Sequence, residues 1–337
     1  MTAGNDTQPT EISNIFRQAA DHFQQGNLPA AESMLQRILD IKPVHADANH
    51  LAGLIALQHG QNESAVSAIE RAIKSSPRVP EYYYNYGLAL YAGGRREEAL
   101  AAYERAIQLK PEFPEAYLNR GITLSDIGRP EEALASYESA IRLRPGFVLA
   151  FFNHGNALVA LERMEEALVD YERATRLDPD FIDAHFNLAN TFNNLGHPDK
   201  ALPAYERVIE LDPGHVEAIN GRGELLVLLS RLEEALAAFD LAIENQPDFA
   251  QAHYNRGNCL KQLGRLPEAA DAFRTALRHD PDHVDAGYFL RVVDGEKPPA
   301  RSPREYVIKE FDGFSDSFDR HLVEGLGYRI PGSCLMP

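Results

Sequence analysis

A proline recurs at a constant spacing of 34 residues along most of this chain. No insertion or deletion interrupts the series, so the units have one fixed length. A period of this size is the sequence signature of a repeat array, in which each unit packs mainly on its neighbours. The prolines are Pro43, Pro77, Pro111, Pro145, Pro179, Pro213, Pro247 and Pro281.

Two further columns keep the same register. One is always alanine and the other is always glycine or alanine, which predicts two helices per unit that approach closely where the side chains are small. The alanines are Ala31, Ala65, Ala99, Ala133, Ala167, Ala201, Ala235 and Ala269, and the small residues are Ala19, Gly53, Gly87, Gly121, Gly155, Ala189, Gly223 and Gly257.

A glycine stands between the two predicted helices of most units, as at Gly60, Gly94 and Gly128. Glycine tolerates the positive φ with which a helix often ends. Glu162 and Ser230 take its place in two units, so we expect strained or differently closed turns there. The whole pattern predicts an all-α solenoid of antiparallel helix pairs.

The second predicted helix of each unit carries two more recurring features. Several of these helices open with a pair of glutamates, such as Glu131 and Glu132, which we interpret as complementing the helix dipole. A large apolar residue follows and predicts packing between adjacent units. The members of this column are Leu35, Ile69, Tyr103, Tyr137, Tyr171, Tyr205, Phe239 and Phe273.

These columns resemble the signature of the tetratricopeptide repeat family over residues 12–283. The resemblance implies a right-handed superhelical solenoid of eight units, with the first helices lining its concave face. Residues 284–295 begin a ninth unit and then stop, which predicts a capping helix. Residues 1–11 are predicted to be disordered.

The charge balance argues against several classes of function. Lysine and arginine total 33 against 50 aspartates and glutamates, which gives a net charge of −17. Such a chain repels phosphate backbones and anionic membrane surfaces, which argues against nucleic-acid binding. No apolar stretch approaches the length that spans a bilayer, so we expect no membrane insertion. Because no apolar signal segment is evident, a cytoplasmic location is the default. No cofactor or metal site is predicted, and the oligomeric state stays open.

Asparagine recurs on the first helix of the units, in two columns three residues apart on one helix face. Asparagine is a poor helix former, so its repetition indicates a use for the amide. A side-chain amide carries one acceptor and two donors, which match the C=O and N–H of a peptide group. The first column holds Asn85, Asn119, Asn153, Asn187 and Asn255, and the second holds Asn156, Asn190 and Asn258.

Residues 186–201 (FNLANTFNNLGHPDKA) and 254–269 (YNRGNCLKQLGRLPEA) are similar to repeats of the O-linked N-acetylglucosamine transferase family. The resemblance implies that the first column is an asparagine ladder that holds an extended peptide. The seventh unit departs from the pattern, with Gly221 in the column and Asn220 one residue early, which predicts an interruption of the ladder.

Three interpretations of the asparagines stay open: a solvated polar face, a structural tie between neighbouring units, and a peptide-binding ladder. The aromatic residues that precede the ladder either pack between helices or add apolar contacts to a ligand. Three arginines stand one residue after the ladder position of their unit and would add positive charge to this face. The aromatic residues are Tyr84, Phe152, Phe186 and Tyr254, and the arginines are Arg120, Arg222 and Arg256.

Beyond the repeats, residues 296–304 are typical of a proline-rich linker. Apolar residues then recur at helical spacing from Val307 to Leu322, which predicts an amphipathic helix within residues 305–337. The segment 306–331 resembles the opening of a methyltransferase domain that follows such arrays in bacteria. The resemblance implies the start of a truncated enzyme domain, and a docking helix is the alternative.

The leading hypothesis is a non-enzymatic scaffold that binds a protein or an extended peptide in the concave groove. The first alternative is the substrate-recruiting arm of an S-adenosylmethionine-dependent methyltransferase. The second is an adaptor of a protein glycosyltransferase.

Overall fold

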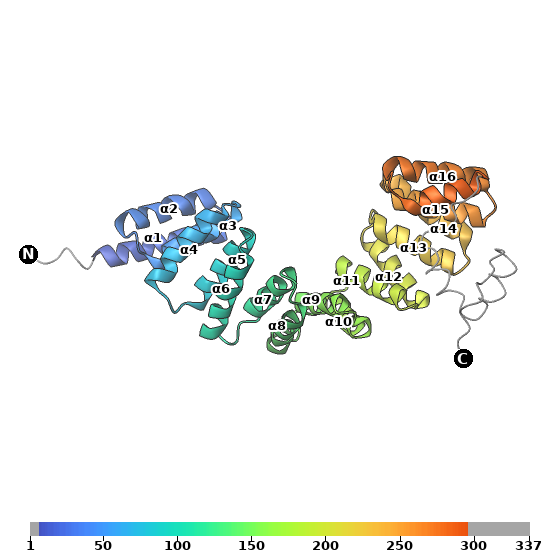
Figure 1. The fold of residues 1–337 in the computed structure, drawn as a ribbon. Helices are drawn as coiled ribbons and strands as arrows, with labels where there is room; N and C mark the ends of the chain where they lie inside the picture. Colours follow the sequence, from blue (N-terminus) through green and yellow to red (C-terminus); the bar gives the residue numbers. More distant parts are fainter. Residues whose placement is uncertain (1–6, 296–337) are drawn as a thin grey trace, which may run out of the picture. The chain divides into compact units, whose positions relative to one another are not determined.

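The computed structural model describes residues 7–295, and every element in this range is an α-helix (Figure 1). Short turns join consecutive helices, and no strand occurs in the described range. The predicted all-α class is therefore confirmed. The predicted linker at 296–304 and the predicted helix and methyltransferase start at 305–337 lie outside the described residues.

The helices fall into two units, Met1–Ala184 and His185–Pro337, whose boundary lies within α11. In the first unit each odd-numbered helix packs on the even-numbered helix that follows it, and that helix packs on the next odd-numbered one. Every repeat is thus one helical hairpin stacked on its neighbour. The helices are α1 (Thr7–Gln24), α2 (Leu28–Ile41), α3 (Ala46–Gln58), α4 (Asn62–Ser75), α5 (Pro80–Ala92), α6 (Arg96–Leu109), α7 (Pro114–Asp126), α8 (Pro130–Leu143), α9 (Val148–Ala160) and α10 (Met164–Leu177).

The second unit continues the same alternation. The helices from α12 to α17 pack each on the next, so the hairpin remains the structural element. These helices are α11 (Ile182–Asn194), α12 (Pro198–Leu211), α13 (Val216–Leu228), α14 (Leu232–Asn245), α15 (Ala250–Gln262), α16 (Leu266–His279) and α17 (Val284–Val293).

The observed structure at the two ends of the array can be compared with the predictions from the sequence. Helix α1 begins at Thr7, within the stretch 1–11 for which the sequence predicts disorder. Pro9 stands in the first turn of α1, where a missing backbone N–H breaks no helical hydrogen bond. At the other end, α17 occupies most of residues 284–295 and packs on α16, with Ala286 and Phe289 buried.

In the six hairpins whose small residue is glycine, a large side chain of the second helix lies against that glycine. A Cβ added to Gly87 would stand 2.5 Å from the Tyr103 ring, and one added to Gly121 would stand 2.4 Å from the Tyr137 ring. No carbon atoms pack that closely, so the absent side chain sets how near the two helices come. The buried large column therefore packs within each hairpin, in addition to the contacts between repeats that the sequence predicts.

The turns between the paired helices close with one residue of positive φ. Six of these residues are glycines, with φ between 69° at Gly60 and 77° at Gly94. Glu162 and Ser230 adopt the same conformation, each with φ of 59°. The two turns thus close in the ordinary way, and the strain expected from the sequence is carried by L-residues in the left-handed region.

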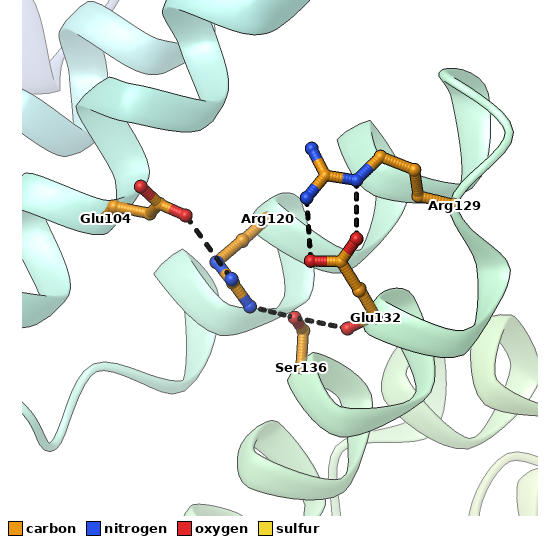
Figure 2. A network of polar contacts seen from close by, with 5 residues as sticks. All are labelled: Glu104, Arg120, Arg129, Glu132 and Ser136. Atoms are coloured by element: carbon orange, nitrogen blue, oxygen red, sulfur yellow. Dashed lines mark hydrogen bonds and ion pairs between the residues drawn. The ribbon is translucent and has the colours of Figure 1, made fainter.

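An arginine and a glutamate brace the start of the second helix in several repeats. Arg129 precedes α8 and donates from Nε and Nη2 to the two carboxylate oxygens of Glu132, each at 2.6 Å (Figure 2). The hydrogen bond from this guanidinium lowers the pKa of Glu132. The second member of each acidic pair is therefore part of the fold. The same contact between a guanidinium and a carboxylate forms in four other pairs, which are Arg95–Glu98, Arg163–Glu166, Arg231–Glu234 and Arg265–Glu268.

We expect Glu162→Gly and Ser230→Gly each to raise the free energy of unfolding by about 1 kcal/mol, because glycine removes the left-handed strain. Urea denaturation followed by circular dichroism measures the change. Gly128→Ala is the converse control. Gly128 has a φ of +74°, and a Cβ added there meets no atom within 4 Å, so alanine adds only backbone strain. A lower stability of either glycine variant would contradict this account of the turns.

Candidate functional site

The predicted asparagines lie on odd-numbered helices, the first helix of each hairpin. They are half-buried, except Asn255, which is buried. In the first unit, α5 carries Asn85, α7 carries Asn119, and α9 carries Asn153 and Asn156; in the second, α11 carries Asn187 and Asn190, and α15 carries Asn255 and Asn258.

Three asparagines of the first column are tied to the preceding repeat. The side-chain nitrogen of Asn85 lies 2.8 Å from His50 Nε2, and that of Asn119 donates to the Tyr84 hydroxyl at 3.2 Å. Asn255 Nδ2 donates to Asn220 Oδ1 at 3.0 Å. Each partner stands 35 positions earlier in the chain, on the first helix of the previous repeat. The interpretation of the asparagines as structural ties between neighbouring repeats thus applies to these three residues.

Asn153 has no such tie. The residue 35 positions before it is Leu118, which has no polar side-chain atom. Asn153 Nδ2 instead donates to the backbone oxygen of Leu149, one turn earlier in α9, at 2.7 Å. In the second unit, Asn187 is half-buried in α11, and its backbone oxygen accepts from the Thr191 hydroxyl at 2.7 Å.

The second column is held by tyrosines of the second helix. The Tyr171 hydroxyl donates to Asn156 Oδ1 at 2.7 Å, and the Tyr205 hydroxyl donates to Asn190 Oδ1 at 2.5 Å. The eighth repeat has Phe273 at the tyrosine position, and Asn258 Oδ1 is buried without a hydrogen-bond partner in the described part of the chain. The large column thus also orients amides, a role that the sequence analysis missed.

Members of the two columns use opposite halves of the amide inside the fold, although Asn255 uses both its nitrogen and its oxygen. In Asn85, Asn119 and Asn153 the nitrogen donates to the protein, which leaves the carbonyl oxygen able to accept. In Asn190 the tyrosine occupies the oxygen, which leaves the nitrogen able to donate. A face with acceptors in one column and donors in the other matches both polar groups of a peptide unit.

The arginines after the ladder phase do not supply free positive charge. Arg120 Nη1 donates to Ser136 Oγ at 2.7 Å, and its Nη2 lies 3.3 Å from Glu104 Oε1, in the second helix of the preceding repeat (Figure 2). Arg256 pairs with Asp240 at 2.6 Å in the same way. The prediction of a positively charged face is wrong, because the preceding repeat neutralises these side chains. Arg222 follows the pattern, 3.8 Å from Glu206.

The aromatic residues before the ladder pack across the junction to the next repeat. In the first unit, the rings of Tyr84 and Phe113 have their centroids 4.9 Å apart. In the second, the rings of Tyr254 and His283 are 4.6 Å apart. Of the two open interpretations, packing between helices accounts for these rings. Phe152 and Phe186 make equivalent contacts with Phe181 and His215.

The interruption at the seventh repeat has a packing cause. The sixth repeat carries Ala189 in the small column, and its Tyr205 lies against the next first helix. A Cβ at Gly221 would stand 2.7 Å from Tyr205 Cζ and 2.9 Å from its hydroxyl oxygen. An asparagine cannot replace Gly221 unless this ring moves. The same helix carries Glu224 in the second column, a substitution for asparagine that the sequence analysis passed over.

His50 links the first ladder asparagine to α3. Burial lowers its pKa to about 4, although Asp47 and Glu81 act in the opposite direction. The ring lies against Tyr82 with the centroids 4.5 Å apart. A neutral His50 therefore accepts the hydrogen bond from Asn85 through Nε2.

Comparison with known families gives matches along most of the described chain. One model described as tetratricopeptide repeat matches residues 16–62, 50–116 and 186–248, and another matches residues 114–147 and 250–283. A model described as TPR repeat matches residues 155–196.

Several solved structures are similar. YrrB, described as a TPR protein with an unusual peptide-binding site, is 30% identical with a TM-score of 0.52; the match covers 57% of this chain and 99% of YrrB. PilF of Pseudomonas aeruginosa is 19% identical with a TM-score of 0.55, covering 63% of this chain and 97% of PilF. The Cut9–Hcn1 structure is 15% identical with a TM-score of 0.52, covering 83% and 55%. The last two support the fold alone. The curated proteins give no match.

Two further features concern the described residues only. None of their helices combines the length and the apolar character that crossing a bilayer requires. Their histidine, cysteine and acidic side chains form no group of three or more suited to a metal ion.

We expect Asn255→Ala to lower the free energy of unfolding by about 2 kcal/mol, because it leaves the buried Asn220 Oδ1 without its donor and removes one of the two donors to Glu224 Oε1. Asn153→Ala is the matched comparison and should change stability by less than about 0.5 kcal/mol, because Asn153 is tied only within its own helix. Urea titrations of the two variants measure the difference. Equal losses would contradict the division of the ladder into tied and untied members.

We also expect His50 to make the first unit sensitive to acid. Its folded pKa of about 4 lies below the ordinary value, so between about pH 6.5 and pH 4 the unfolded chain takes up a proton that the folded chain does not. Stability therefore falls as the pH falls through this window, by about 2 kcal/mol between pH 7 and pH 5. His50→Gln keeps an acceptor for Asn85 and should remove that part of the loss in urea titrations at the two pH values. An unchanged pH dependence would contradict the assignment.

Proposed function

Because this chain belongs to the tetratricopeptide repeat family, we propose that it is a protein-interaction scaffold that binds an extended segment of a partner protein along its first helices. The observation that carries the proposal is the opposite use of the two asparagine columns. An acceptor column beside a donor column offers complementary groups to the N–H and C=O of a peptide backbone. Such contacts recognise the backbone and do not depend on the partner's side chains.

The orientation of the amides supports binding over a merely solvated surface. A solvated asparagine rotates freely, and ordering it on binding would cost conformational entropy. Here the hydroxyls of Tyr171 and Tyr205 fix Asn156 and Asn190, and the Leu149 carbonyl fixes Asn153. A pre-ordered amide loses less entropy when a ligand arrives, which is the advantage of a preorganised site.

The similarity to YrrB points in the same direction. YrrB is 30% identical over almost its full length and is described as having a peptide-binding site. We extend peptide binding from that protein to this one, with the asparagine columns as the contact residues and a non-enzymatic role. The alternatives of a methyltransferase arm and a glycosyltransferase adaptor gain no support from the described residues, and the cytoplasmic location stays a prediction.

The test uses the complete chain as bait for a random-peptide phage library, followed by fluorescence anisotropy of the best synthetic binder. We expect Asn153→Ala to weaken a binder that contacts the first unit, and Asn190→Asp to weaken a binder that contacts the second unit, each about fivefold, the equivalent of one amide hydrogen bond of about 1 kcal/mol. Asn190→Asp retains the acceptor for the Tyr205 hydroxyl and replaces the amide donor by a negatively charged oxygen, so the hydrogen bond from Tyr205 should persist.

Asn245→Ala is the matched control. Asn245 donates to the backbone oxygen of Leu241 at 2.9 Å, the same bond within one helix that Asn153 makes, but it lies exposed at the end of a second helix. Its loss should leave peptide affinity unchanged. The proposal fails if the library yields no binder, or if all three variants weaken binding equally.

A further inference from the structure

Glu224 is a half-buried carboxylate without a basic partner among the described residues. It lies on α13, at the second-column position where three other repeats carry asparagine. The nearby arginines of this face are engaged elsewhere: Arg222 lies by Glu206, and Arg256 pairs with Asp240. The seventh repeat therefore carries a negative charge where its neighbours carry a neutral amide.

Two buried amides hold this carboxylate in place. Glu224 Oε1 accepts from Asn220 Nδ2 at 3.1 Å and from Asn255 Nδ2 at 2.7 Å. Asn220 is only 6% exposed and Asn255 only 9%. Gln251 in turn donates to Asn255 Oδ1 at 3.1 Å, which fixes the orientation of that amide. Side chains of two successive repeats thus fix the position of one oxygen atom.

A charge removed from water is normally compensated by an opposite charge or by several hydrogen bonds. Asp170 in the first unit illustrates the usual arrangement, because it lies 2.6 Å from His154 Nδ1. Glu224 has only neutral donors, and both contact the same oxygen. Its second oxygen, Oε2, is left to accept, and a cation is the partner that would compensate the charge.

The surroundings of Glu224 supply acceptors and aromatic rings. Burial and the Glu224 carboxylate raise the pKa of Tyr205, and burial raises the pKa of Tyr254 to about 12, with Asp285 and Glu224 adding to the effect. Both tyrosines are therefore neutral. Asn258 Oδ1 and Asp285 Oδ1 are buried without hydrogen-bond partners in the described range. Two buried oxygen atoms near Tyr254 are thus without donors among the described residues.

We propose that Glu224 binds a basic side chain of the bound segment, and that the seventh repeat selects a lysine or arginine at one position of the partner. The inference rests on the proposed function. Lysine suits the site better than arginine, because a two-pronged guanidinium contact needs both carboxylate oxygens and Oε1 already accepts two hydrogen bonds. The ammonium group of lysine needs only Oε2.

The experiment repeats the random-peptide selection on the complete chain and on Glu224→Gln, and compares the residues enriched at each peptide position. The native chain should enrich lysine or arginine at one position. Glu224→Gln keeps an oxygen for Asn220 and Asn255 and should still select peptides, but without that preference. Replacing the basic residue of the selected peptide by its uncharged analogue, norleucine for lysine, should weaken binding to the native chain about tenfold.

Glu210→Gln is the control, because it makes the same change in net charge on the second helix of the preceding repeat, where Glu210 pairs with Arg207. It should retain the basic preference. Glu224→Lys should shift the preference to acidic residues, and thermal unfolding of each variant confirms that it is folded. Enrichment without a basic preference in the native chain, or a preference that survives in Glu224→Gln, overturns the inference and leaves peptide binding intact. A failure to enrich any peptide overturns the proposed function itself.

Discussion

The contact between a small residue of the first helix and a large side chain of the second determines the geometry of most repeats. It fixes how closely the two helices approach, and therefore which first-helix positions remain at the surface. The asparagine columns flank this contact, two residues before and one residue after the small position. Where the contact changes, the asparagines change with it. Ala189 replaces glycine in the sixth repeat, Tyr205 lies against Gly221, and the ladder is interrupted at that helix.

Much of the fold could be predicted from the sequence, because its signals are local and repeated. The helix pairs, the strained turn at Glu162 and the presence of a helix within residues 284–295 follow from spacing and backbone chemistry. The extent of α1 could not be predicted in the same way, because Thr7 precedes the repeat pattern. A proline in the first turn was the available signal.

The candidate site was predictable only in part. The sequence locates the asparagines, but the half of each amide that remains for a ligand depends on a residue in another repeat. Asn85 meets His50 and Asn255 meets Asn220, whereas the corresponding residue for Asn153 is Leu118. The apparent charge of the arginines was misjudged for the same reason, because their carboxylate partners belong to the preceding hairpin. Contacts of this kind become visible when positions 16 and 35 residues apart are compared.

The interruption of the asparagine ladder at the seventh repeat affects how a ligand would be aligned. A row of equivalent amides binds any stretch of backbone equally well, so a bound chain could slide along it from one residue to the next. Gly221 removes one equivalent contact, and Glu224 introduces a charge that no other described repeat carries in that column. At the seventh repeat the registers are no longer equivalent, so one register of the bound chain becomes distinguishable from all the others. An irregular repeat can thus fix the register of a bound chain on an otherwise uniform row of binding residues.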